Sequence, residues 1–217
     1  MIYVGWAALY EGETDAHYFN ALIPRVMTDL VLRNNAQAAT IPEMPAVRLS
    51  RGPVDQVAKE ACRARDAFLM VFIHADSGGR SVEASLPSRG AAYCEAMQRR
   101  CGWEPVRCVT VTPRHETESW MLADPMAVTK ALGSRATAEN LGLPIDANGA
   151  ERLTDPKRVL TNAIQIVTGR RRRRLNDLQF LYSSIAERQS LDSLRVSRSF
   201  VAFEARLKDA LVSVHCL

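Results

Sequence analysis

Carboxylate side chains follow predicted strands at three places in this sequence of 217 residues. Ionised carboxylates supply the hard oxygen ligands that Mg²⁺ prefers. A cation held by two or three of them can neutralise phosphate charge and activate water. The three positions together predict a metal centre that binds Mg²⁺ or Mn²⁺. The acids at these positions are Glu11 with Glu13 and Asp15, then Asp76, and finally Glu118 with Glu116.

The first acidic position lies between an apolar run and an amphipathic segment. Residues 2–10 are mostly apolar and predict a buried strand, which ends in a turn at Gly12. Apolar residues then recur at helical spacing and predict a helix from Thr14 to about Arg33. The junction of a strand and the following helix is the usual ligand crevice of open α/β sheets. A structural alternative makes Thr14 the helix N-cap, with Glu13 and Asp15 complementing the helix dipole.

Three further apolar runs predict the rest of a sheet. We expect strands over residues 46–49, 67–73 and 106–111, with helices between them. This alternation predicts an α/β fold with a Rossmann-like parallel sheet of about four strands flanked by helices. Adjacent strands lie about 4.8 Å apart, so acids at neighbouring carboxyl ends can share a cation. We predict an α/β domain over residues 1–125 and a helical, arginine-rich extension packed on it over residues 126–217.

Charge is distributed unevenly along the chain. Residues 1–150 contain 15 basic and 17 acidic residues, whereas residues 151–217 contain 13 basic and 7 acidic ones. The second part includes an arginine run, Arg170, Arg171, Arg172, Arg173 and Arg174. This run could be a solvated helix surface, a flexible linker or a phosphate-binding strip. Successive like charges repel one another unless anions neutralise them, so we favour contact with nucleic-acid phosphates.

The composition disfavours several classes of protein. No stretch approaches eighteen uninterrupted apolar residues, so we expect no membrane span. The N-terminus lacks the pattern of a secretory signal, so we expect a cytoplasmic protein. The cysteines include no close CxxC pair, so we expect reduced, mostly buried thiols and no zinc site. They are Cys62, Cys94, Cys101, Cys108 and Cys216.

Three other residues near the acidic positions have mainly structural interpretations. We expect His74 to be buried and hydrogen-bonded, on the opposite side of its strand from Asp76. Trp120 lies at an apolar helix start and is expected to anchor the core rather than to stack on bases. Glu116 is expected to point away from Glu118, provided that the segment between them is extended.

Short motifs at the acidic positions resemble those of Toprim domains. Residues 11–15, Glu-Gly-Glu-Thr-Asp, resemble the EGxT(E/D) opening of these domains, particularly in the OLD-nuclease branch. Residues 73–78 resemble the strand end that carries a DxD motif. Residues 118–124 resemble the E-(A/S)-W-x-L-A-D stretch of small standalone Toprim-like proteins. Features resembling the tails of those proteins are Asp155-Pro156-Lys157, the arginine run and Ser199-Phe200.

The resemblance implies a Toprim-like fold and Mg²⁺-dependent action on phosphodiesters, with Glu11, Asp15, Asp76 and Glu118 at the metal. It also implies an ABC- or OLD-type ATPase partner in prokaryotic defence. We therefore expect a nuclease that acts on DNA or structured RNA, and a homo-oligomer is compatible with this expectation. One departure supports an alternative, because Gly78 stands where the second DxD acid belongs. In that alternative the chain is a noncatalytic, degenerate Toprim module that binds nucleic acid or a partner protein.

Overall fold

A computed structural model describes residues 2–34, 39–78, 90–169 and 175–217. Its centre is a parallel sheet with the strand order β4-β2-β5-β6. The strands are β2 (Trp6–Leu9), β4 (Val47–Arg48), β5 (Met70–His74) and β6 (Cys108–Val111). A separate parallel pair is formed by β1 (Ile2–Tyr3) and β3 (Ala39–Thr40).

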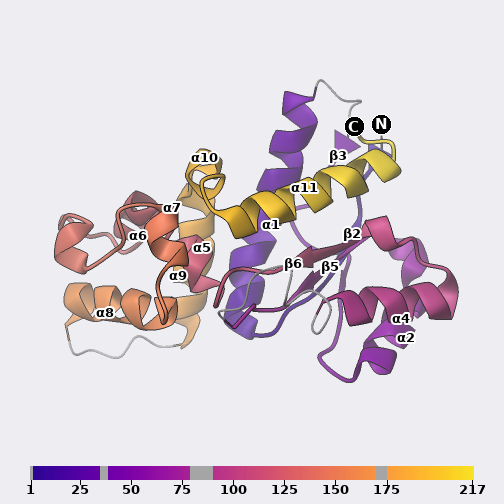
Figure 1. The fold of residues 1–217 in the computed structure, drawn as a ribbon, viewed down its shortest axis with the longest axis horizontal. Coiled ribbons are helices and arrows are strands. Elements are labelled where there is room, and N and C mark those ends of the chain that lie inside the picture. Colours follow the sequence, from indigo (N-terminus) through magenta and orange to yellow (C-terminus); the bar gives the residue numbers. More distant parts are fainter. Residues whose placement is uncertain (1, 35–38, 79–89, 170–174) are drawn as a thin grey trace.

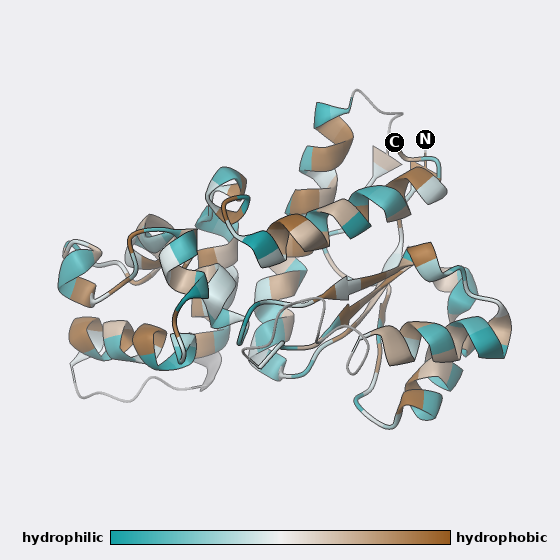
Figure 2. Ribbon diagram, viewed as in Figure 1, coloured by the Kyte–Doolittle hydropathy of each residue, from teal (hydrophilic) through white to brown (hydrophobic). Residues whose placement is uncertain are grey.

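The strands β2, β5 and β6 are buried along their whole length, which explains their mostly apolar sequences. Successive side chains along a strand point to opposite faces, so each strand contributes to two cores. Trp6 and Phe72 belong to the larger core, whereas Ala7 and Val71 belong to the smaller one. The hydropathy colouring shows the central strands as mostly hydrophobic (Figure 2).

Each face of the sheet has its own pair of helices (Figure 1). The helices α1 (Glu13–Arg33) and α11 (Arg198–Ser213) supply the larger core, in which Phe203 of α11 contacts Phe72 of β5. The helices α2 (Val54–Arg63) and α4 (Ala91–Cys101) cover the other face. The first crossover helix and the second thus lie on opposite faces, which is the doubly wound arrangement.

The remaining helices form a helical region beside the sheet (Figure 1). They are α5 (Glu118–Met121), α6 (Pro125–Ala131), α7 (Ala147–Glu151), α8 (Pro156–Thr168), α9 (Leu175–Arg188) and α10 (Leu191–Leu194). Short 3₁₀ turns are η1 (Arg65–Ala67), η2 (Pro105–Arg107) and η3 (Glu139–Leu141). The helix α9 packs along α1, so the larger core runs from the sheet into this region without interruption.

The predicted fold class is confirmed: four parallel strands are flanked by helices, and the C-terminal region is helical. The proposed division at residue 125 stays a prediction. The arginine run, Arg170–Arg174, lies outside the described residues. Within the described ranges, no helix combines the length and apolarity needed to cross a bilayer.

The predicted start of the first helix was wrong by one residue, and so was its proposed cap. The helix α1 begins at Glu13, its N-cap position is Gly12, and no described side chain caps it. A Cβ atom at Gly12 would lie 2.7 Å from Asp15 Oδ2, because the Asp15 carboxylate folds back toward the start of the helix. Asp15 lies in the first turn of α1, where its negative charge complements the helix dipole.

The prediction of reduced thiols was also wrong. Disulfides join Cys62 to Cys101 and Cys94 to Cys108, with Cα–Cα distances of 6.0 Å and 5.6 Å. These distances suit a disulfide. The pairs are 39 and 14 residues apart in sequence and meet only because α2, α4 and β6 pack together. Cys216 is free and buried.

Candidate metal and phosphodiester site

The candidate site lies at the carboxyl edge of the sheet, where β2 and β5 are neighbours. The chain leaves β2 toward one side of the sheet and β5 continues on the other, so the strand order reverses at this pair. Leu9 pairs with Ile73, which places Glu11 beside the end of β5. The backbone N–H of Glu11 donates to His74 Nδ1 at 3.4 Å. Glu11 and Asp76 are thereby brought to the same edge, as the sequence predicted.

His74 stands at the centre of these acids. Its Nε2 atom lies 3.1 Å from Asp76 Oδ1 and 3.2 Å from Thr117 Oγ1, and its Nδ1 atom lies 4.0 Å from Asp15 Oδ2. The imidazole is fully enclosed and packs on the ring of Phe19, with ring centroids 4.6 Å apart. The expectation of a buried, hydrogen-bonded histidine is confirmed. The expectation that it faces away from Asp76 was wrong, because residues two apart on a strand share a face.

The surrounding acids favour the charged form of His74. Burial is the largest single influence on the pKa of His74 and lowers it, but the hydrogen bond to Asp76 and the nearby negative charges together outweigh burial. The charges of Asp76, Asp15 and Glu11 act in the same direction as that bond, so the net effect raises the pKa of His74. A histidine therefore occupies the middle of the acidic group and offsets part of its mutual repulsion.

Glu118 belongs to the same end of the molecule but has a different partner. It is the first residue of α5, not the end of a strand, and only 4% of its surface is exposed. Its Oε1 atom accepts a hydrogen bond from the Tyr182 hydroxyl of α9 at 2.7 Å. Burial raises the pKa of Glu118, although the Tyr182 hydrogen bond and the charge of Lys157 oppose this shift.

Tyr182 connects the two acidic groups. Burial raises the pKa of its hydroxyl, and the charges of Glu118, Asp15 and Glu116 raise it further. Asp15 thus acts on both His74 and Tyr182. The sequence analysis missed Tyr182 and Thr117. Tyr182 is 64 residues from Glu118, and only its helical apolar spacing was visible in the sequence.

The segment before α5 is a turn. The orientation expected for Glu116 required an extended segment, so it does not apply. His115 has a left-handed backbone with φ of +65°, and Glu116 N donates to Arg114 O at 3.0 Å. Glu116 Oε2 is buried and has no hydrogen-bond partner among the described residues. A buried carboxylate oxygen without a donor is costly unless water or a cation contacts it.

Gly78 is also not part of an extended strand. Its φ is +60°, and its N–H donates to the carbonyl of His115 at 3.1 Å. A Cβ atom added there would meet nothing within 4 Å. An aspartate would therefore have space at this position, but it would need a left-handed backbone.

The carboxylates fit a cation incompletely. Within the described parts of the chain, no group of three or more His, Cys, Asp or Glu side chains is arranged to hold a metal ion. Glu11, Asp15 and Asp76 surround His74 instead, and Glu118 bonds Tyr182. Mg²⁺ keeps several waters and needs only one or two direct carboxylates. Asp15 and Asp76 supply that number of carboxylates beside His74, so the residues present fit a cation that keeps most of its waters.

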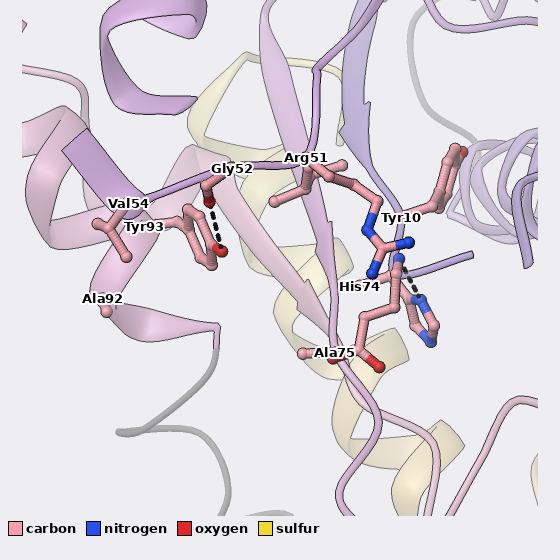
Figure 3. Close-up of a pocket in the computed structure, with 10 residues that line it drawn as sticks. Tyr10, Arg51, Gly52, Val54, His74, Ala75, Ala92 and Tyr93 are labelled. Atoms are coloured by element: carbon pink, nitrogen blue, oxygen red, sulfur yellow. Dashed lines mark hydrogen bonds between the residues drawn. The ribbon is translucent and has the colours of Figure 1, made fainter. Parts of the chain in front are cut away.

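A cavity of about 530 Å³ opens beside this cluster (Figure 3). Glu11 and His74 form one part of its lining. The other walls come from the segment before α2 and from the start of α4, and they include Arg51, Gly52 and Tyr93. Among the candidate ligands, Glu11 is the one that lines this cavity, on the α2 and α4 side of the sheet.

Comparison with known protein families assigns the chain to one of them. Residues 10–208 match the family described as a domain of unknown function (DUF4276), and the chain belongs to this family. No curated protein matches the sequence. No solved structure matches the fold.

Proposed function

We propose that this protein is a metal-dependent nuclease that cleaves phosphodiester bonds in DNA or structured RNA. The observation that carries the proposal is the convergence of Glu11, Asp15 and Asp76 around His74 at the carboxyl edge of two neighbouring strands. Open α/β sheets bind ligands at this edge, and it is the position at which the sequence resembles Toprim domains.

In this proposal Asp15 and Asp76 hold Mg²⁺ or Mn²⁺ directly or through water, and Glu11 and Glu118 complete the acidic surroundings. The cation would supply charge neutralisation for the phosphate and a more acidic bound water. His74 orients Asp76 through its Nε2 contact and lowers the repulsion among the acids. Tyr182 holds the Glu118 carboxyl in place.

The wider setting is part of the same proposal and rests on the resemblance to Toprim proteins. We propose a cytoplasmic protein of prokaryotic defence that works with an ABC- or OLD-type ATPase. The arginine run is proposed to contact nucleic-acid phosphates. Copurification with the ATPase encoded beside the gene tests the partner. If a neighbouring ATPase is absent or does not copurify, the partner proposal is wrong.

A second candidate function has its own support. Gly78 stands at the position of an expected acid, and Glu118 is engaged by Tyr182. Together with the incomplete metal geometry, this favours a noncatalytic module that binds nucleic acid or a partner protein.

Cleavage assays with Mg²⁺ and Mn²⁺ on labelled DNA and structured RNA separate the two candidates. The nuclease proposal expects metal-dependent cleavage that falls about 100-fold or more in Asp76→Asn, because a metal ligand supplies several kcal/mol to the transition state. Asp66→Asn is the matched control, since the Asp66 side chain is 98% exposed and precedes the amino end of β5. Equal cleavage by wild type and Asp76→Asn would contradict the proposed site, and absence of cleavage by wild type in both metals would contradict the nuclease proposal. Nucleic-acid binding without cleavage in either metal would support the second candidate.

A further inference from the structure

The cavity beside the acidic cluster has features that the metal proposal does not use. Its volume of about 530 Å³ lies within the range of about 300–1,000 Å³ that is typical of small-molecule sites. Apolar side chains form much of its lining, namely Leu9, Val54, Ala75 and Ala92. Polar groups are concentrated at two places, near Tyr93 and near Arg51 (Figure 3).

Tyr93 provides an aromatic wall at one end of this cavity. It lies in the first turns of α4, is partly buried, and packs against the smaller core. Its hydroxyl donates to the carbonyl of Gly52 at 3.4 Å, which fixes the ring relative to the segment before α2. A fixed ring beside apolar side chains is a platform for a flat, aromatic ligand group.

Arg51 provides a cation at the other end. Its side chain extends from the segment before α2 toward the part of the cavity where His74 lies (Figure 3). The residue is exposed and makes no hydrogen bond or ion pair with any residue that the structure describes. A guanidinium presents several donors in one plane, which suits a phosphate group.

We propose that this cavity binds one unpaired nucleotide, with its base against Tyr93 and its phosphate beside Arg51. The inference rests on the proposed function in that the bound phosphate would lie next to Glu11 and His74, where cleavage is proposed. In a duplex both faces of a base are covered by stacking, so a base must be unpaired or turned out of the helix to reach Tyr93. The site therefore selects single-stranded or locally open substrate.

The test is equilibrium binding of a labelled single strand in Ca²⁺ buffer, measured by fluorescence anisotropy. Tyr93→Leu keeps an apolar side chain and removes the aromatic face, and we expect it to weaken binding about 5- to 100-fold. Tyr93→Phe should bind within about twofold of wild type, because it keeps the face. Tyr3→Leu, which changes a tyrosine that is 60% exposed in β1, is the aromatic control. Thermal melting of each variant identifies any that has failed to fold.

Arg51→Ala should change the salt dependence of binding, which Tyr93→Leu should not. We expect it to flatten the plot of log affinity against log salt by about 0.7, the value for one phosphate contact to a single strand. Tyr93→Leu should leave that slope unchanged. Arg99→Ala, an exposed arginine of α4, is the control for loss of a positive charge. An unchanged affinity in folded Tyr93→Leu and an unchanged slope in Arg51→Ala would overturn the proposal.

The same variants separate this inference from the proposed function. If wild type cleaves with metal and folded Tyr93→Leu binds and cleaves equally well, the nucleotide subsite is wrong and the nuclease proposal stands. If no metal supports cleavage but Tyr93→Leu loses single-strand binding, the subsite stands and the nuclease proposal is wrong. Competition by adenosine 5′-monophosphate, but not by ribose 5-phosphate, would assign the site to free nucleotides. Competition by neither, with loss in Tyr93→Leu, would assign it to a nucleotide within a strand.

Discussion

Two buried glutamates in this protein differ in how many hydrogen bonds they accept and in the direction of their pKa shifts. Glu118 at the sheet edge is 4% exposed and accepts one side-chain hydrogen bond, from Tyr182. Glu151 at the end of α7 is 5% exposed and accepts hydrogen bonds from Ser197 and Ser199 at the start of α11. Burial raises the pKa of Glu118, whereas at Glu151 the hydrogen bonds outweigh burial and lower the pKa.

The difference separates a buried carboxylate that has several hydrogen-bond donors from one that has a single side-chain donor. Glu151 is held ionised by donors that belong to an N-terminal helix cap, so its charge is used within the structure. Glu118 lies near the acid Glu116, and its one side-chain hydrogen-bond donor is Tyr182. Perturbed carboxylates of this second kind are concentrated at functional sites. This contrast adds to the main support for the proposed site, which is the convergence of Glu11, Asp15 and Asp76 around His74.

The largest effect on stability is expected from removing Glu151. Glu151→Ala should lower the free energy of unfolding by about 3–5 kcal/mol, because it leaves Ser197 and Ser199 without their buried, charged acceptor. Glu118→Ala should cost only about 0–2 kcal/mol, because the loss of the Tyr182 bond is partly offset by removal of a poorly solvated acid. Urea unfolding of both variants measures the difference. Equal losses would remove the distinction between the two glutamates.

Reduction of the disulfides provides a control on the opposite face of the sheet. The chain-entropy model assigns about 3–4 kcal/mol to each of the two loops that the disulfides close. We therefore expect reductant to lower the midpoint of unfolding while Glu151→Ala remains more destabilised than Glu118→Ala. Thiol titration of the denatured, non-reduced protein should find one free thiol, Cys216. Five thiols would show that the pairs stay reduced.

The pH dependence of stability should have opposite signs for the two glutamates. The pKa of Glu151 is lowered by folding, so its contribution is present above the unfolded value of about 4.3 and is lost as pH falls through the folded pKa. The pKa of Glu118 is raised by folding, so Glu118 destabilises the protein as pH rises from about 4.3 through the folded pKa. As pH rises from about 4.3 through the folded pKa of Glu118, the stability of Glu118→Gln should therefore increase relative to wild type. As pH rises from the folded pKa of Glu151 to about 4.3, the stability of Glu151→Gln should decrease relative to wild type.

Urea unfolding in EDTA across acidic and neutral pH measures both differences. The groups that act on Glu118 are Tyr182, Lys157 and Glu116, and those that act on Glu151 are Ser197, Ser199 and the backbone of Arg198. Parallel pH profiles for the two glutamine variants would contradict the assigned directions.

The smallest effect is expected at Gly78. Gly78→Asp should cost roughly 1 kcal/mol of stability because it requires a left-handed backbone, which aspartate tolerates better than most residues. Its side chain has space. If the acid reaches the cluster, Mn²⁺ should bind more tightly than in wild type. Gly78→Asn is the neutral control, and equal Mn²⁺ affinity in both variants would show that residue 78 does not face the metal.

The sheet could be predicted because each strand carries its own signal. The residues of β2 are apolar, as are those of β5 up to its last residue, His74, and the acids that follow the two strands lie where parallel strands bring their ends together. The partnership of His74 and Asp76 was also accessible, since the two residues share a strand face. The analysis placed them on opposite sides and missed it.

Contacts between distant segments could not be predicted in this way. Glu118 meets Tyr182 only because α9 packs along α1, and no local pattern encodes that packing. The same reason applies to the disulfides, whose cysteines lie on separate elements. Gly78 looked like part of a strand end, but its backbone is left-handed and its N–H donates to the carbonyl of His115, which is 37 residues away in the sequence.

The central claim is that the acids at the ends of β2 and β5 bind a divalent cation. Titration of Mn²⁺ followed by electron paramagnetic resonance tests it directly, because free and bound Mn²⁺ give different signals. The account predicts saturable binding in wild type, strong loss in Asp76→Asn and Asp15→Asn, and no change in Asp66→Asn. Binding that is absent from wild type, or that survives unchanged in both Asp76→Asn and Asp15→Asn, would contradict it.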